Sequence, residues 1–128
     1  MNVPEDRRYT DQHEWIKLEG NVATIGITDH AQDALGDVTF VELPPAGKQV
    51  SKGDEACAIE SAKAAAGIYA PADGTIAEGN AEVENDPALV NSDCYGQGWI
   101  YKIELSDPTQ IDGLMNAAEY DRFLAEQG

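Results

Sequence analysis

Basic residues are scarce in this sequence of 128 residues, which has 8 lysines and arginines against 24 aspartates and glutamates. The formal net charge of −16 argues against binding to nucleic acid or to an anionic membrane surface, because both would repel the chain. The charge is compatible with docking on basic patches of partner proteins, and equally with a role in solubility alone. The length predicts a single domain, spanning residues 1–128, with a core of modest size.

Long apolar runs are also lacking. No stretch approaches the roughly 20 residues that a membrane-spanning helix needs. Residues 1–6 are polar and have no apolar segment of a secretory signal, and Arg7 and Arg8 stand near acidic residues instead of in an arginine-rich transit segment. We therefore expect a cytoplasmic protein if the chain is bacterial, or a mitochondrial matrix protein if a presequence has been removed.

Candidate metal ligands and catalytic thiols are few. Cys57 and Cys94 are far apart in the sequence, and together with His13 and His30 they show none of the usual metal-ligand spacings. Cys57 alternates with Ile59, which is typical of a small buried residue in a strand. An activated nucleophile or a phosphate-binding loop is not recognisable either. The sequence thus predicts a non-catalytic protein without a bound metal.

What the sequence does contain is a series of short strand-like segments separated by Gly, Pro and Asp. The expected strands are residues 14–19, 22–27, 38–43, 55–60, 67–70, 74–77 and 98–105. Helices are expected in residues 28–35, closed by Gly36, in the turn opened by Asp86-Pro87, and in the apolar-periodic stretch from Ile111 to Phe123. Many short strands with such turns predict a small sandwich or barrel.

Lys63 lies in a run of small residues between two of these segments. Residues 57–59 lead into the run and residues 68–70 lead out of it, and the residues between are too few and too small to form a packed element. The simplest geometry is a β-hairpin with Lys63 at or near its tip and its ammonium in water. Such a lysine suits an enzyme that grips the turn and acylates the amine, although a plain solvated lysine is the alternative.

The surroundings of this lysine favour the first interpretation. Residues 60–64 read Glu60-Ser61-Ala62-Lys63-Ala64, and residues 69–71 are Tyr-Ala-Pro. This pattern is similar to the lipoyl-lysine hairpin of the glycine cleavage system H-protein family. Further segments that resemble the family, in order along the chain, are residues 9–10, 13–15, 22–28, 31–32, 35–38, 40–44, 80, 87–91, 95–99 and 105–108.

The resemblance implies a fold, a cofactor and partners. The fold is mainly β, a flattened barrel-sandwich hybrid of the biotinyl/lipoyl-carrier type with short helices and a C-terminal helix. Lipoic acid is attached through an amide to Lys63 by a lipoate ligase or octanoyltransferase, with Glu60, Ser61 and Ala64 as the recognition motif. The lipoyl-lysine arm shuttles an aminomethyl group from glycine decarboxylase to aminomethyltransferase, and dihydrolipoyl dehydrogenase reoxidises it.

A cleft that shelters the loaded arm is a further expectation. Glu14 offers a carboxylate to the ammonium of the cargo, Trp15 offers an apolar face, and His30 faces the same cleft or simply packs. The alternative is that Glu14 is a solvated strand charge and Trp15 a core aromatic. Ala66-Gly67 stands where the family often has a serine and an acidic residue, so shelter in this chain would depend more heavily on Glu14.

Two related functions use the same kind of lysine. A lipoyl domain of a 2-oxoacid dehydrogenase complex has a hairpin tip similar to Asp-Lys-Ala, whereas Ala62 precedes Lys63 here. Such a domain also continues into a Pro/Ala-rich linker, which is not seen in this sequence. A biotinyl carrier would have methionine on both sides of the lysine. A lipoyl relay protein, which passes lipoate or octanoate to other lipoyl domains, needs the same lysine as the glycine carrier, so the sequence does not separate the two.

Overall fold

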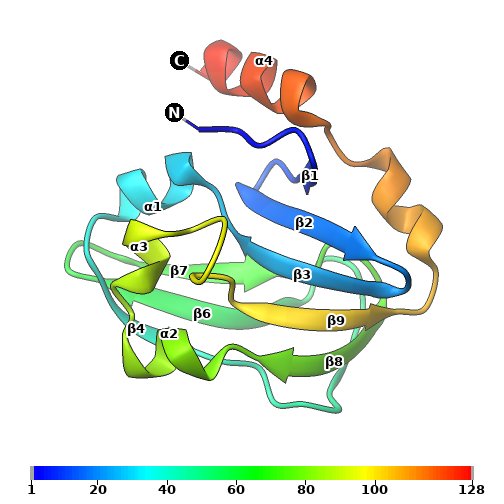
Figure 1. Cartoon of the computed structure of the whole chain (residues 1–128), viewed down its shortest axis with the longest axis horizontal. Helices are drawn as coiled ribbons and strands as arrows, with labels where there is room; N and C mark the ends of the chain where they lie inside the picture. Colours follow the sequence, from blue (N-terminus) through cyan, green and yellow to red (C-terminus); the bar gives the residue numbers. More distant parts are fainter. Residues whose placement is uncertain (1, 128) are drawn as a thin grey trace.

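Two antiparallel sheets form the framework of the computed structural model, which describes residues 2–127 (Figure 1). The larger sheet has the strand order β1-β2-β3-β9-β8-β5, and the smaller has the order β4-β6-β7. The strands are β1 (Arg8–Tyr9), β2 (Glu14–Glu19), β3 (Val22–Ile27), β4 (Val38–Glu42), β5 (Gln49–Val50), β6 (Glu55–Ser61), β7 (Ala65–Tyr69), β8 (Gly74–Gly79) and β9 (Tyr101–Leu105).

The helices are short and lie at the ends and outside of the sheets (Figure 1). They are α1 (Asp29–Leu35), α2 (Ala81–Asn85), α3 (Leu89–Ser92), the 3₁₀ helix η1 (Pro108–Gly113) and the C-terminal α4 (Ala117–Gln127). The expected mainly-β architecture with short helices and a C-terminal helix is therefore confirmed. Within residues 2–127, none of the helices combines the length and the apolar character that crossing a membrane requires.

The main core lies between the two sheets. Ile25 and Ile103 from the larger sheet and Ile59 and Ile68 from the smaller one are at most 2% exposed and belong to one apolar cluster. Each such side chain contributes about 1.5–3 kcal/mol through burial. Because every second residue of a strand faces this core, the opposite face of the small sheet is left for solvent.

A second, aromatic cluster attaches α4 to the outside of the larger sheet. The rings of Tyr9 and Tyr120 stack with centroids 4.7 Å apart, and Trp15 is 1% exposed in the same cluster. The Trp15 indole N–H donates to the carbonyl of Cys94 at 2.9 Å. The face of β2 that carries Trp15 is thus covered by the C-terminal helix and its neighbours.

Locally encoded elements agree with the sequence-based expectations. The hairpin of β2 and β3 turns at Gly20, whose φ of 64° suits glycine. Thr28 caps α1, with its side-chain oxygen accepting from the Ala31 amide, and Gly36 ends that helix with φ 74°. These features depend on neighbours in the sequence, which is why the pattern predicts them.

The C-terminal segment differs from the expected continuous helix. Leu114 is extended, with ψ 161°, and Met115 exchanges backbone hydrogen bonds of 2.8 and 3.1 Å with Tyr9, which separates η1 from α4. The last strand begins at Tyr101 instead of residue 98. The sequence also missed β1, β5 and α2, which are short and are fixed by pairing or packing with distant segments.

Candidate functional site

Lys63 is at the tip of the β6–β7 hairpin, as predicted. β6 ends at Ser61 and β7 begins at Ala65, so residues 62–64 form the connection, and all three are exposed. In Figure 1 this green loop projects beyond α1 and α3. The neighbours of Lys63 are alanines, which leave its amine open to a modifying enzyme and leave room for an amide-linked group.

The side chain of Ser61 organises this turn. Its hydroxyl oxygen accepts from the backbone amides of Lys63 and Ala64 at 3.2 and 3.1 Å, and the hydroxyl donates to the Ala64 carbonyl at 3.1 Å. The Ser61 amide also donates to the Ala64 carbonyl at 2.8 Å. Such local hydroxyl-to-backbone bonds are favoured in turns. The sequence placed Ser61 in a recognition motif but missed this structural role, for which the serine two residues before an exposed lysine is a usable signal.

The loop between α1 and β4 supports the tip. Ala62 donates its amide to the Asp37 carbonyl at 3.0 Å, and Asn91 donates to the Gly36 carbonyl at 2.8 Å while accepting from the Val38 amide at 2.9 Å. A β-carbon added at Gly36 would lie 3.1 Å from Cε of Lys63. The aliphatic stem of the lysine therefore rests on a glycine, at the side of the tip that faces β4.

Glu60 and Ala64, the other residues of the expected recognition motif, flank the tip. Glu60 is exposed on β6 and pairs in register with Ala65 across the hairpin. Ala64 precedes β7 and adds no bulk beside the lysine. The structure therefore gathers the whole motif at one end of the small sheet.

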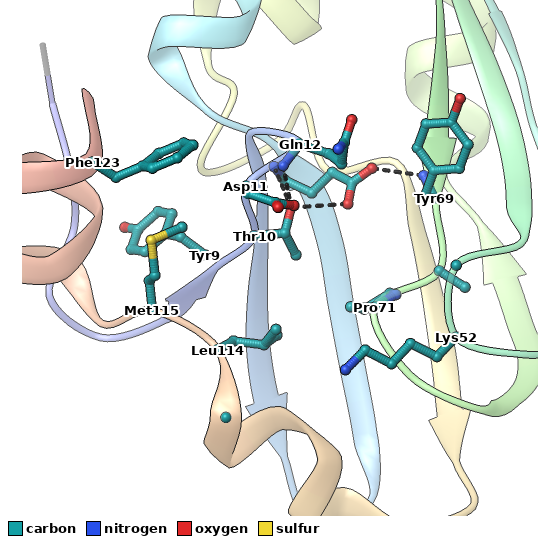
Figure 2. A pocket seen from close by; sticks show the side chains of 14 residues that line it. Tyr9, Thr10, Asp11, Gln12, Lys52, Tyr69, Pro71, Leu114, Met115 and Phe123 are labelled. Carbon is teal, nitrogen blue, oxygen red and sulfur yellow. Dashed lines mark hydrogen bonds between the residues drawn. The ribbon is translucent and has the colours of Figure 1, made fainter. Parts of the chain in front are cut away.

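A cavity of about 760 Å³ lies beside the other end of β7 (Figure 2). Four segments far apart in the sequence form its walls, which are residues 9–12 with Glu14, residues 52–53, residues 69–71, and residues 113–115 with Phe123. Figure 2 shows the Phe123, Met115 and Leu114 side chains opposite Tyr69 and Pro71. The lining is largely apolar, with the carboxyl groups of Asp11 and Glu14 and the amine of Lys52 as its charged groups.

Glu14 is the buried charge of this cavity. The residue is 2% exposed. One carboxyl oxygen accepts from the Thr10 hydroxyl at 3.1 Å and the other accepts from the Tyr69 amide at 2.6 Å, as the dashed lines in Figure 2 show. Burial raises the pKa of the carboxyl to about 7, although both hydrogen bonds oppose the rise. The alternative that Glu14 is a solvated strand charge is therefore wrong.

Trp15 and His30 do not line the cavity. Trp15 follows Glu14 in the strand and so points to the opposite face, into the aromatic cluster under α4. His30 is half-buried on α1, with its ring centroid 4.5 Å from that of His13, whose Nδ1 lies 2.7 Å from the Tyr120 hydroxyl. Desolvation lowers the pKa of His13, and the neighbouring His30 adds to the effect. Of the three residues expected to form the cleft wall, only Glu14 therefore lines the cavity, and its other walls come from residues that the sequence did not indicate.

The thiols have no reactive character. Cys57 and Cys94 are 5% and 7% exposed, and burial raises the pKa of each to about 12. Within the described residues there is also no group of three or more His, Cys, Asp or Glu side chains that could hold a metal ion.

Sequence reasoning missed Thr10, Tyr69 and Lys52 as cavity residues. Each is near a recognisable turn or strand end, but their proximity arises because the two sheets pack together, as the hydrogen bond from the Tyr69 amide to Glu14 shows. No local pattern carries that information.

A small antiparallel sandwich that displays one lysine on an exposed, serine-capped hairpin defines a protein of the lipoyl-carrier class. The family model described as glycine cleavage H-protein matches residues 7–127. The chain belongs to this family, as the resemblance implied.

Relatives with assigned names agree with this membership. The chain is 50% identical over 119 residues to the glycine cleavage system H protein of Parvibaculum lavamentivorans, covering 93% of this chain and 95% of that protein. It is 50% identical over 125 residues to the mitochondrial glycine cleavage system H protein 2 of Arabidopsis thaliana, covering 98% and 80%.

A solved structure has the same fold. The crystal structure of a glycine cleavage system H protein from Mycobacterium marinum superposes with a TM-score of 0.88 at 38% identity, covering 96% of this chain and 99% of that one. Neither a lipoyl relay nor a 2-oxoacid dehydrogenase domain is favoured by these similarities.

Proposed function

We propose that this chain is the lipoyl carrier of a glycine cleavage system, with lipoic acid attached to Lys63. The observation that carries the proposal is the exposed lysine between two alanines on a turn fixed by Ser61, in a chain of the glycine cleavage H-protein family. When bound, the lipoyl group supplies a dithiolane that accepts the aminomethyl group of glycine. The protein presents the arm, and Glu60, Ser61 and Ala64 form the surface that the attaching enzyme reads.

The partners follow from this role. A lipoate ligase or octanoyltransferase modifies Lys63, glycine decarboxylase and aminomethyltransferase load and unload the arm, and dihydrolipoyl dehydrogenase restores the disulfide. We assign no bond-making step to the chain itself, in agreement with the burial that raises the pKa of both cysteine thiols to about 12. The net charge of −16 suits docking on basic surfaces of these enzymes. One carrier domain spanning residues 1–128 suffices, in the cytoplasm of a bacterium or in the mitochondrial matrix.

The cavity beside Tyr69 lies next to the place where the end of the arm would rest. Lysine side chain and lipoyl tail together would extend about 14 Å. The four residue steps from Lys63 to Gly67 span about 13 Å, and the six steps to Tyr69 span about 20 Å. An arm folded back along β7 would therefore end near Gly67, at the entrance of the cavity. The apolar cavity walls would keep water from one side of its terminal group, and the Glu14 carboxyl provides a proton acceptor within the cavity.

The proposal is tested by locating the lipoyl group. After co-expression with a lipoate ligase, peptide mass mapping should find one lipoyl increment, on the peptide that contains Lys63. Lys63→Arg should abolish the increment and leave thermal unfolding unchanged within about 0.5 kcal/mol, because the exposed tip packs against little. Lys52 is another exposed turn lysine, so Lys52→Arg is the matched control and should still carry one lipoyl group, on Lys63. A lipoyl group on another lysine, with Lys63 bare, would contradict the proposal.

A further inference from the structure

The outward face of β7 forms a route from the hairpin tip to the cavity. Ile68 is buried in the core, so Ala65, Gly67 and Tyr69 share the opposite face of this edge strand. Ala65 presents only a methyl group on this face, whereas at Gly67 the side chains of Glu55 and Tyr69 come close to the strand. An arm from Lys63 would meet little steric obstruction as far as Gly67, where these two side chains lie next to the cavity.

A carboxylate from the neighbouring strand lies over the middle of this route. Glu55 is exposed and pairs in register with Tyr69. A β-carbon added at Gly67 would lie 2.9 Å from Oε1 of Glu55 and 3.1 Å from the hydroxyl oxygen of Tyr69. The carboxylate of Glu55, on β6, therefore lies over Gly67, the residue of β7 that has no side chain.

The hydrogen bonding of Glu14 makes this second carboxylate significant. Both oxygens of Glu14 are already engaged, by Thr10 and by the Tyr69 amide, and the residue is 2% exposed. A cationic cargo that approaches along β7 passes Gly67 before it reaches Glu14. The Glu55 carboxylate does not accept from Thr10 or from the Tyr69 amide, the two donors that Glu14 uses. Glu55 is exposed to solvent, so pairing with an ammonium there costs little desolvation.

We propose that Glu55 is a positioning residue that holds the ammonium of the loaded arm over Gly67, at the entrance of the cavity. The inference rests on the proposed function, because it requires an arm on Lys63. Since the pair is exposed, its effect is modest and is screened by salt.

A stable cationic arm provides the first test. The lipoylated protein is reduced, and both thiols of the arm are alkylated either with 2-bromoethylamine, which adds an ammonium group to each sulfur with loss of bromide, or with bromoethane, which adds a neutral ethyl group to each. Cys57 and Cys94 are buried and should escape alkylation, which intact mass verifies. In the parent protein the amide resonances of Gly67 and Tyr69 should differ between the two arms, because only the ammonium pairs with Glu55.

Two variants decide whether Glu55 causes the difference. Glu55→Gln should remove it. Glu42→Gln should retain it, because Glu42 is an exposed glutamate of the same sheet, on β4, and its loss changes the net charge equally. Loss of the difference in both variants, or retention in both, would overturn the proposal.

Decay of the glycine-loaded protein provides the second test. After removal of the decarboxylase, Glu55→Gln should lose its cargo about two- to fivefold faster than the parent, as expected for an exposed ion pair. The two rates should converge near 1 M salt, where the Debye length is about 3 Å. Glu55→Ala combined with Gly67→Asp, which moves the carboxylate onto β7, should restore slow decay.

The outcomes separate this inference from the proposed function. Equal decay in Glu55→Gln and the parent, with the arm present on Lys63, would overturn the role of Glu55 and leave the carrier function standing. Absence of a lipoyl group on Lys63 would overturn both.

Discussion

At the scale of single residues, Ser61 sets the geometry of the lysine that we propose to be lipoylated. Its hydroxyl oxygen accepts from two consecutive amides, those of Lys63 and Ala64, and so closes the turn around the lysine. Without the hydroxyl, these two amides would donate to water instead, and the tip would adopt other conformations. A modifying enzyme then has to bind a less ordered turn.

Ser61→Ala should therefore slow lipoylation more than it affects stability. Loss of hydrogen bonds that contribute about 0.5–1.5 kcal/mol corresponds to a rate roughly two- to tenfold lower, while global unfolding should change by less than about 1 kcal/mol. The measurement is the rate of mass increase with a purified ligase and lipoate. Ser61→Thr keeps the hydroxyl and should retain most of the rate. Equal rates for the alanine variant and the parent would show that the ligase imposes the turn geometry itself.

At the scale of elements, the β6–β7 hairpin defines where the lysine stands. The tip is tied to the start of β4 by the Ala62 amide and is supported by the loop that Asn91 fixes. Positions 62 and 63 are therefore not equivalent, although both are exposed. Recognition by position would distinguish them.

Moving the lysine by one residue tests this point. Ala62→Lys combined with Lys63→Ala should lower the lipoylation rate about tenfold or more, because a misplacement of about 1 Å in a reacting group costs up to about 100-fold. Ala62→Lys alone keeps Lys63 and should be modified once, at Lys63. Mass mapping reads both results. If the shifted and native lysines were modified at the same rate, the position in the hairpin would not matter.

At the scale of the whole molecule, Glu14 connects the two sheets. It belongs to β2 of the larger sheet and accepts from the amide of Tyr69 in β7 of the smaller one. Because burial raises the pKa of its carboxyl from 4.5 to about 7, the folded state binds a proton more tightly than the unfolded state. Its contribution to stability is full below about pH 4.5 and is lost as the pH rises through 7.

Glu14→Gln should remove this dependence. Relative to the variant, the parent should lose roughly 3 kcal/mol of unfolding free energy between pH 4.5 and 8, as follows from a shift of about two and a half pKa units. Urea unfolding of the unmodified proteins at both pH values gives the difference. Glu42→Gln, an exposed glutamate, should follow the parent. If the unfolding free energies of the parent and Glu14→Gln differed by the same amount at both pH values, the pKa of the Glu14 carboxyl would not be raised in the folded state.

Features that depend on neighbouring residues could be predicted from the sequence. The hairpin with Lys63 at its tip, the turn at Gly20 and the helix between Thr28 and Gly36 depend on turn preferences, caps and strand alternation, all of which act over a few residues. The resemblance carried by residues 60–64 and the flanking segments also indicated the family to which the chain belongs. The roles of the motif residues remain predictions.

The tertiary structure alone decided what surrounds Glu14. Alternation along β2 places Glu14 and Trp15 on opposite faces, but which face becomes the cavity depends on where β7 and the C-terminal segment pack. The break before α4 likewise comes from pairing of Met115 with Tyr9, more than a hundred residues away in the chain. Such contacts depend on the closure of long loops and on the shape of the filled core, and neither leaves a periodic trace in the local sequence.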